Sequence, residues 1–188
     1  NTIVGNSAQN GGGIHNSLVY EPDMQNNILG GNAASIAGPD LWGAFKSNGY
    51  NLIEDPTGAT ITGLDQTDIT GIAPVLYALA DNGGPTQTML PLPDSPVVDA
   101  GYCTETTDQR GVGYARVVDT WLLNSPGGNG CDIGAVELQT LPLMCPDGTS
   151  GDDVLHCQAN PPIYSNSDNN IDLGAGNDAL TLLSGVTV

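Results

Sequence analysis

The chain has 188 residues and a formal net charge of −18 at pH 7, because three basic residues stand against 21 acidic ones. Such a charge repels phosphate backbones and anionic membrane surfaces, which argues against a nucleic-acid partner. It suits divalent cations or a salty medium, or simply keeps a secreted protein soluble. Glycine (26) and proline (13) are too frequent for a helical bundle, and 39% hydrophobic residues are too many for a disordered chain. The composition therefore predicts a compact all-β chain with many short strands.

Neither end of the sequence has the pattern of a natural domain boundary. Residues 1–6 are strand-like, with no basic or apolar leader, and residues 182–188 are again extended and apolar. No apolar run has the length of a membrane span. We therefore expect an interior piece of a larger protein, with no membrane-spanning segment of its own.

Residues 1–80 carry short apolar runs separated by asparagine and glycine, without helical periodicity. The stretches Ile3-Val4-Gly5-Asn6, Ile28-Leu29-Gly30-Gly31-Asn32 and Asn51-Leu52-Ile53 recur at about 24 to 25 residues, near the length of one coil of a three-faced β-solenoid. Asparagine suits the corners of such a coil, because it tolerates left-handed backbone and can form a ladder with an asparagine one coil away. An antiparallel β-sandwich, which also has short runs between turns, stays open as the alternative.

The segment Ile72–Ala80 is apolar almost throughout and has good helix formers after Pro74. Nine residues are too few for periodicity to decide between helix and strand. We predict an extended conformation here.

Residues 81–140 contain four turn-rich motifs, whose glycines, prolines and aspartates favour tight turns between short extended runs. In chain order they are Asp81-Asn82-Gly83-Gly84-Pro85-Thr86-Gln87-Thr88, Ser95-Pro96-Val97-Val98-Asp99-Ala100-Gly101, Asp108-Gln109-Arg110-Gly111 and Asp132-Ile133-Gly134-Ala135-Val136-Glu137.

In this order the four motifs resemble the C-terminal end of choice-of-anchor Q domains, over roughly residues 1 to 138. These domains occur in large secreted bacterial proteins related to polymorphic outer-membrane proteins and other right-handed parallel β-helices. The resemblance implies that residues 1–80 are the last coils of a right-handed parallel β-helix and that residues 81–140 are a loop-rich capping segment. It also implies a structural role in turns for Asp108, Arg110 and Asp132, with Asp108 and Arg110 bonding turn amides and carbonyls or each other. The family places a proline and a second arginine soon after Asp-Gln-Arg-Gly, whereas here residues 112–115 precede Arg116.

Residues 141–188 form a third region, which we predict to be a small β extension after a linker at residues 141–146. Within it, residues 173–181 resemble the nonapeptide of repeat-in-toxin (RTX) calcium-binding β-rolls. The resemblance implies a calcium site made by the carbonyls of Gly174 and Gly176 and the carboxylate of Asp178, aided by Asp172 or Asp168. A plain turn without a metal is the alternative.

The four cysteines are an even set without any Cys-x-x-Cys motif, and in an extracellular chain they predict two disulfides. Three pairings are possible. Cys103 and Cys131 flank the Asp-Gln-Arg-Gly motif, while Cys145 and Cys157 bracket an acidic turn, so we predict sequential pairing. The second disulfide would pin the β extension.

A search for catalytic residues gives one candidate cluster. Many parallel β-helices cleave polysaccharides with grouped carboxylates and a nearby basic residue, and such a group is available here: Asp99, Asp108, Asp119 and Asp132 with Arg110 and Arg116. Aromatic residues for a sugar-binding groove are Tyr20, Trp42, Phe45, Tyr50 and Trp121. The two histidines, His15 and His156, lie in polar surroundings without a nucleophile motif.

Because the carboxylates fall in the capping segment, the sequence favours a non-catalytic function. We predict an extracellular or cell-surface structural or adhesive module of a bacterial protein, not an enzyme. The alternative is a polysaccharide-cleaving or carbohydrate-binding β-helix protein. Partners would be surface glycans or further copies of the chain, since strand edges at both ends predict head-to-tail association into a filament.

Overall fold

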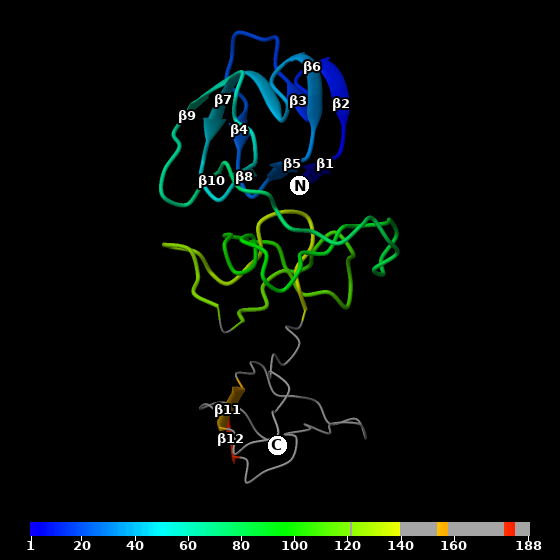
Figure 1. Cartoon of the computed structure of the whole chain (residues 1–188), viewed down its shortest axis with the longest axis vertical. Coiled ribbons are helices and arrows are strands. Elements are labelled where there is room, and N and C mark those ends of the chain that lie inside the picture. Colours follow the sequence, from blue (N-terminus) through cyan, green and yellow to red (C-terminus); the bar gives the residue numbers. More distant parts are fainter. Residues whose placement is uncertain (121, 140–153, 158–178, 183–188) are drawn as a thin grey trace. The chain divides into compact units, whose positions relative to one another are not determined.

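The computed structural model describes residues 1–120 and 122–139, and the backbone of two further strands, β11 (Val154–Cys157) and β12 (Ala179–Leu182). The chain divides into two compact units, Asn1–Gln139 and Thr140–Val188. Every named element in the described residues is a β-strand (Figure 1). The prediction of an all-β chain is confirmed. The described part also contains no long apolar helix of the kind that crosses a membrane.

The chain returns repeatedly to one four-stranded parallel sheet. Its order is β1 (Thr2–Val4), β5 (Ile28–Gly30), β8 (Leu52–Ile53) and β10 (Ile69–Thr70). Neighbours in this sheet are never consecutive in the sequence, so each new pass of the chain adds one strand beside the strand of the previous pass. We call residues 1–80 the strand stack.

Two further groups of strands follow the same rule. The first is β2 (Ser7–Asn10) with β6 (Ala33–Ala37), and the second is built on β7 (Leu41–Ser47), which pairs with β3 (Ile14–His15), β4 (Asp23–Met24) and β9 (Ala59–Thr62). Every strand pair is parallel, those in the second unit included. Parallel pairing is incompatible with the antiparallel sandwich that the sequence left open.

The pairing register corrects the predicted repeat. Thr2 lies opposite Ile28 and Ile3 opposite Leu29, whereas the sequence comparison aligned Ile3 with Ile28. A shift of one residue matters because it exchanges the two faces of a strand. The asparagines carry the true register, since Asn6 bonds to Asn32 at a separation of 26 and Asn27 bonds to Asn51 at a separation of 24. Matching the apolar residues gave the wrong value because Ile28 lies opposite the polar Thr2, and Gly30 lies opposite Val4.

The strand stack encloses one apolar core. Its buried members are Met24, Leu29, Leu41, Phe45 and Ile53, with Ile3, Ile14, Ala59 and Ile61 packed against them. Phe45 is therefore a core residue and contributes nothing to a surface groove, contrary to its place among the predicted aromatics.

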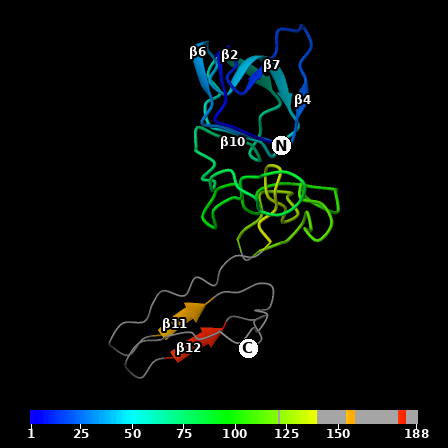
Figure 2. The same cartoon turned by 90° about the vertical axis from the view of Figure 1, so that its right-hand side faces the viewer.

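The segment after the strand stack, residues 81–139, contains no named strand and is held by loops (Figure 2); we call it the motif segment. Isolated antiparallel bridges join Gly101 to Cys131 and Thr107 to Ala115. Its Val97, Ala100 and Ile133 pack on Ile28 and Leu52, on the outward face of the first sheet. The segment therefore covers one side of the strand stack. The two inner strands of the first sheet, β5 and β8, are thus buried on both faces, as parallel strands usually are.

In the second unit, β11 and β12 form a two-stranded parallel sheet with Val154 opposite Ala179. The predicted calcium residues Asp168, Asp172, Gly174, Gly176 and Asp178 lie outside the described residues, as do Trp121 and Cys145.

Candidate functional site

Three of the four sequence motifs supply side chains to a buried ionic cluster inside the motif segment, and the fourth packs against it. Its members have at most 6% of their surface exposed. They are Asp99, Asp108, Arg110, Arg116, Thr120, Asp132 and Glu137. The fourth predicted aspartate of the carboxylate group, Asp119, is exposed and does not join them.

Asp108 and Arg110 form the first ion pair of the cluster. Arg110 Nη2 lies 2.6 Å from Asp108 Oδ2, and it also donates to the carbonyl of Glu137 at 2.6 Å. Asp108 accepts the backbone N–H of Arg110 at 2.7 Å and that of Glu137 at 2.9 Å. The pair therefore links the loop around Asp108 to the backbone of Glu137, close to the C-terminal end of the motif segment.

The Asp81–Thr88 motif encloses this pair from outside. The Arg110 guanidinium lies over the ring of Tyr114, 4.1 Å from its centre, which is a cation–π contact. Gly84 has φ +79°, and a Cβ there would lie 2.6 Å from Arg110 Cα. A Cβ on Gly83 would clash even more severely with the Tyr114 hydroxyl. The two glycines are therefore required by the approach of this turn to the Arg110–Tyr114 pair.

Arg116 and Glu137 form the second ion pair. Arg116 Nη1 lies 3.3 Å from Glu137 Oε2, and its Nη2 donates to the carbonyls of Asp132 and Gly134 at 3.1 and 2.7 Å. Glu137 Oε1 accepts the backbone N–H of Val118 at 2.8 Å. Arg116, which the intervening residues separate from its motif, still reaches the cluster.

Two further carboxylates bind backbone amides rather than cations. Asp132 Oδ1 accepts the N–H of Asp99 at 2.9 Å, and Oδ2 accepts that of Leu138 at 2.7 Å. Asp99 has φ +54° and accepts both the N–H and the hydroxyl of Thr120. Because the motif segment lacks regular strands, these side chains take the place of a sheet in satisfying its amides.

Burial changes the titration of these carboxylates. It raises the pKa of Asp132 to about 7, and the charge of Asp99 adds to the shift. It raises the pKa of Glu137 to about 8, with repulsion from Asp132 as the second cause. The pKa of Asp99 is also raised by burial.

The side chains of the cluster are sealed from solvent, and no buried side-chain N or O atom in the described residues lacks a hydrogen-bond partner. The one hydroxyl in it, on Thr120, donates to Asp99 and has no histidine beside it. The cluster holds the loops of the motif segment together through bonds to their backbone groups.

A disulfide between Cys103 and Cys131 adds a covalent link, and the prediction of this bond is confirmed. Asn129 lies beside it, accepting from the N–H of Cys103 at 3.2 Å and donating to its carbonyl at 2.8 Å. The predicted Cys145–Cys157 bond falls outside the described residues.

Asn26 fixes the motif segment to the strand stack. Its side chain donates to the carbonyl of Tyr102 and accepts from the N–H of Tyr102 at 3.1 Å, and its own carbonyl accepts from Gly134 at 3.2 Å. A Cβ on Gly134, which has φ +108°, would lie 2.9 Å from Thr2 Oγ1. The motif segment therefore sits directly on β1 and on the turn before β5.

Two ladders of side-chain amides run along the strand stack. In the first, Asn1 donates to Asn27, Asn27 to Asn51, and Asn51 to Asp68. In the second, Asn6 donates to Asn32, and Asn32 to Asp40. The asparagines therefore pair between neighbouring passes, as the sequence predicted.

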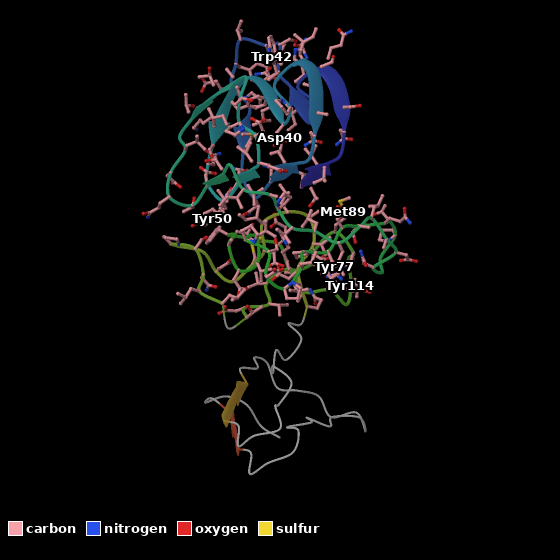
Figure 3. The ribbon with its side chains drawn as sticks, viewed as in Figure 1. Asp40, Trp42, Tyr50, Tyr77, Met89 and Tyr114 are labelled. Atoms are coloured by element: carbon pink, nitrogen blue, oxygen red, sulfur yellow. A yellow bond between two sulfur atoms is a disulfide. The ribbon has the colours of Figure 1, made fainter. Side chains whose placement is uncertain are left out.

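The surface aromatics do not converge on carboxylates. Trp42 and His15 pack edge to face with ring centres 4.7 Å apart, on strands β7 and β3. Tyr50 stacks on Tyr102 at 6.0 Å, and Tyr20 is exposed. Figure 3 shows Trp42 in the strand stack, well apart from Tyr114 in the motif segment.

Two surface hollows occur in the first unit. One, of about 230 Å³, is lined by neutral residues that include Asn6, Gln87 and Gln109. The other, of about 340 Å³, contains Asp40, Glu54 and Asp55. Each of these three carboxylates accepts a backbone amide, and neither hollow includes a basic residue. The described residues hold no group of three or more histidine, cysteine or acidic side chains arranged for a metal ion.

Several residues of the cluster were not singled out as structural from the sequence. Glu137 ends the Asp132 motif and was read only as part of it, and nothing in the pattern pointed to Thr120. Outside the cluster, Asp40 and Asp68 lie 8 and 17 residues after the asparagines that bond to them, so the repeat of 24 to 26 residues did not point to them.

Comparison with family models finds no matching family, and comparisons with curated proteins and with solved structures find no match.

Proposed function

We propose that residues 1–139 are the end of a right-handed parallel β-helix, flanked by a segment like that of choice-of-anchor Q domains. The proposal is supported by parallel strands that return once per pass and by the four motifs, which lie together at one cluster. In this reading the chain is a non-catalytic structural or adhesive module of a bacterial surface protein. A buried disulfide is in keeping with an extracellular or cell-surface location.

One observation carries the non-catalytic role. The carboxylates and guanidinium groups that resemble a polysaccharide-cleaving site are buried and are bonded to backbone amides and carbonyls of the same segment. A general acid or base must reach its substrate, and these groups do not.

The test uses the full chain and polygalacturonate, an anionic polysaccharide. We expect no cleavage, measured as new reducing ends or unsaturated products. We also expect Asp108→Asn to reduce the free energy of unfolding. Turnover by the wild-type chain that disappears in a folded Asp108→Asn variant would contradict the proposal.

The Trp42–His15 pair favours carbohydrate binding as the second candidate. Trp42 lies on the outward side of β7, where its neighbours Leu41 and Phe45 point into the core. Ring stacking on a neutral sugar suits this chemistry. Affinity electrophoresis in neutral glycans tests it: Trp42→Ala should abolish any retardation, and Tyr77→Ala, a change at an exposed tyrosine outside β3 and β7, should not.

Calcium binding by the second unit remains a prediction from residues 168–178. Calorimetric titration with calcium, on the full chain and on Asp178→Asn, tests it. Heat from the wild type alone supports the site, and equal traces from both chains contradict it.

A further inference from the structure

The first amide ladder has a direction. Asn27 donates both its backbone N–H and its Nδ2–H to Asn51 Oδ1, at 3.1 and 2.9 Å. Asn51 repeats this toward Asp68 Oδ1, at 3.0 and 3.1 Å. Asn27 and Asn51 therefore each supply two donors to the side-chain oxygen of the next pass, whereas Asn1 supplies one to Asn27.

Asp68 has neither of these donors to offer. A carboxylate only accepts hydrogen bonds, and the backbone N–H of Asp68 is bonded to the carbonyl of Asp65 at 3.2 Å. Its second oxygen, Oδ2, accepts from Ser47 Oγ at 2.8 Å and from the N–H of Asp65 at 3.2 Å. The ladder therefore stops at this residue.

The second ladder also ends on a carboxylate, but inside the stack, because Asn32 and Asp40 are eight residues apart and belong to the same pass. Asn32 donates to Asp40 Oδ1 at 2.8 Å, and Asp40 Oδ2 accepts the N–H of Asp55 at 2.7 Å. Asp40 is buried. Both ladders thus run in the direction of the chain and both finish on a carboxylate.

Among the described residues, no strand pairs with the edges of the stack beyond Asp68. β10 is the last strand of the first sheet, and β9 pairs with β7 alone. Exposed edges of this kind invite another strand, and proteins oppose such pairing with groups that the incoming strand cannot satisfy.

We propose that Asp68 closes this end of the strand stack against a second copy of the chain. A pass of a second copy that stacked on β10 and continued the ladder would bring the side-chain oxygen of its own rung against the Asp68 carboxylate. Two acceptors would face each other, whereas the steps from Asn27 and from Asn51 each have two donors. This mismatch discriminates against head-to-tail stacking while leaving the rest of the edge unchanged.

The experiment compares the full-length wild type with Asp68→Asn and with Asp65→Asn. Asp65 lies in the same loop and its loss removes the same charge, but it is not a ladder rung, since it accepts only from Thr67. Asp68→Asn restores a side-chain donor. We expect sedimentation velocity to show self-association about tenfold tighter for Asp68→Asn, with Asp65→Asn unchanged from wild type.

Hydrogen exchange localises the contact. Association of Asp68→Asn should protect residues 59–62 and 69–70, the edges of β9 and β10. No added association, or association without protection there, overturns the proposal. If Asp68→Asn does not fold, Asp68→Ser supplies a hydroxyl donor in its place. A wild-type chain that already associates with these edges protected also overturns it.

Discussion

The strand stack and the motif segment satisfy their backbone in opposite ways. In the strand stack, each pass pairs with the previous one, and the buried polar side chains are mainly neutral amides. In the motif segment, charged side chains accept and donate for loops that have no neighbouring strand. Repetition makes the first arrangement tolerant of sequence change, whereas the second depends on a few individual residues.

The largest expected effect follows from removing a cation of the cluster. Arg110→Met leaves Asp108 buried without its ion pair, and we expect a loss of roughly 3–5 kcal/mol in the free energy of unfolding. Urea unfolding of the full chain measures the loss, and hydrogen exchange at residues 108–138 locates it.

The control is Lys46→Met. Lys46 also pairs with an aspartate, Asp23, at 3.2 Å, but their side chains are 53% and 62% exposed. A surface pair contributes about 1 kcal/mol or less. Equal losses for the two variants would show that the cluster is not the structural centre of the motif segment.

The disulfide is the next largest contribution that we expect. In the chain-entropy model, a loop of 28 residues closed by Cys103–Cys131 contributes roughly 3–4 kcal/mol. The double change Cys103→Ser/Cys131→Ser should speed hydrogen exchange in the motif segment while leaving β5 and β8 protected. Equal acceleration in both regions would mean that they unfold as one unit.

Removing one asparagine side chain from the first ladder should reduce the free energy of unfolding by less than either of these changes. Asn51 is fully buried, and Asn51→Ala leaves the side-chain amide of Asn27 without its acceptor, at a cost of roughly 2–3 kcal/mol. Asn6→Ala, at an exposed rung, should cost less than about 1 kcal/mol by the same measurement. The reverse order would mean that burial does not set the strength of the ladder.

The last expected effect is a dependence on pH. The pKa values of Asp132 and Glu137 are raised in the folded chain to about 7 and about 8, so folding favours their protonated forms. Stability from these two groups is therefore fully present below the unfolded values near pH 4 and is lost as pH rises through 7 to 8. Urea midpoints across this range check it. Glu137→Gln should flatten the curve, and a steeper one would contradict the assignment.

The sequence predicted the strand stack better than the motif segment, for a physical reason. A parallel repeat is visible as recurring apolar runs. The predicted length of 24 to 25 residues agrees with the second interval and is wrong only for the first, since apolar residues near Ile28 fit two registers. Asn6 and Asn32 would have chosen the correct one, because a ladder requires equivalent positions.

In the motif segment, the sequence indicated the participants but not their arrangement. Asp108 and Arg110 are two residues apart, and their bond is local. Arg116 bonds to Glu137, which is 21 residues further along the chain. The segment between them is irregular, so no repeat in the sequence predicts that the two side chains are close. Asp132 binds amides rather than a cation because of the conformation of the loops around it. The residue types alone do not predict that conformation.

The clamp at Asn26 has a consequence for the order in which the chain folds. Asn26 bonds to Tyr102 across 76 residues, and the Ala135 N–H bonds to Thr2 across 133. Closing such long loops is slow compared with forming the local pairs of the strand stack. During synthesis, the side chains of Ile28 and Leu52 stay exposed to solvent until Val97 and Ile133 have left the ribosome and packed on them. A nascent chain halted before residue 97 therefore exposes an apolar sheet face that is prone to aggregate. This is the stage at which a chaperone would be needed most.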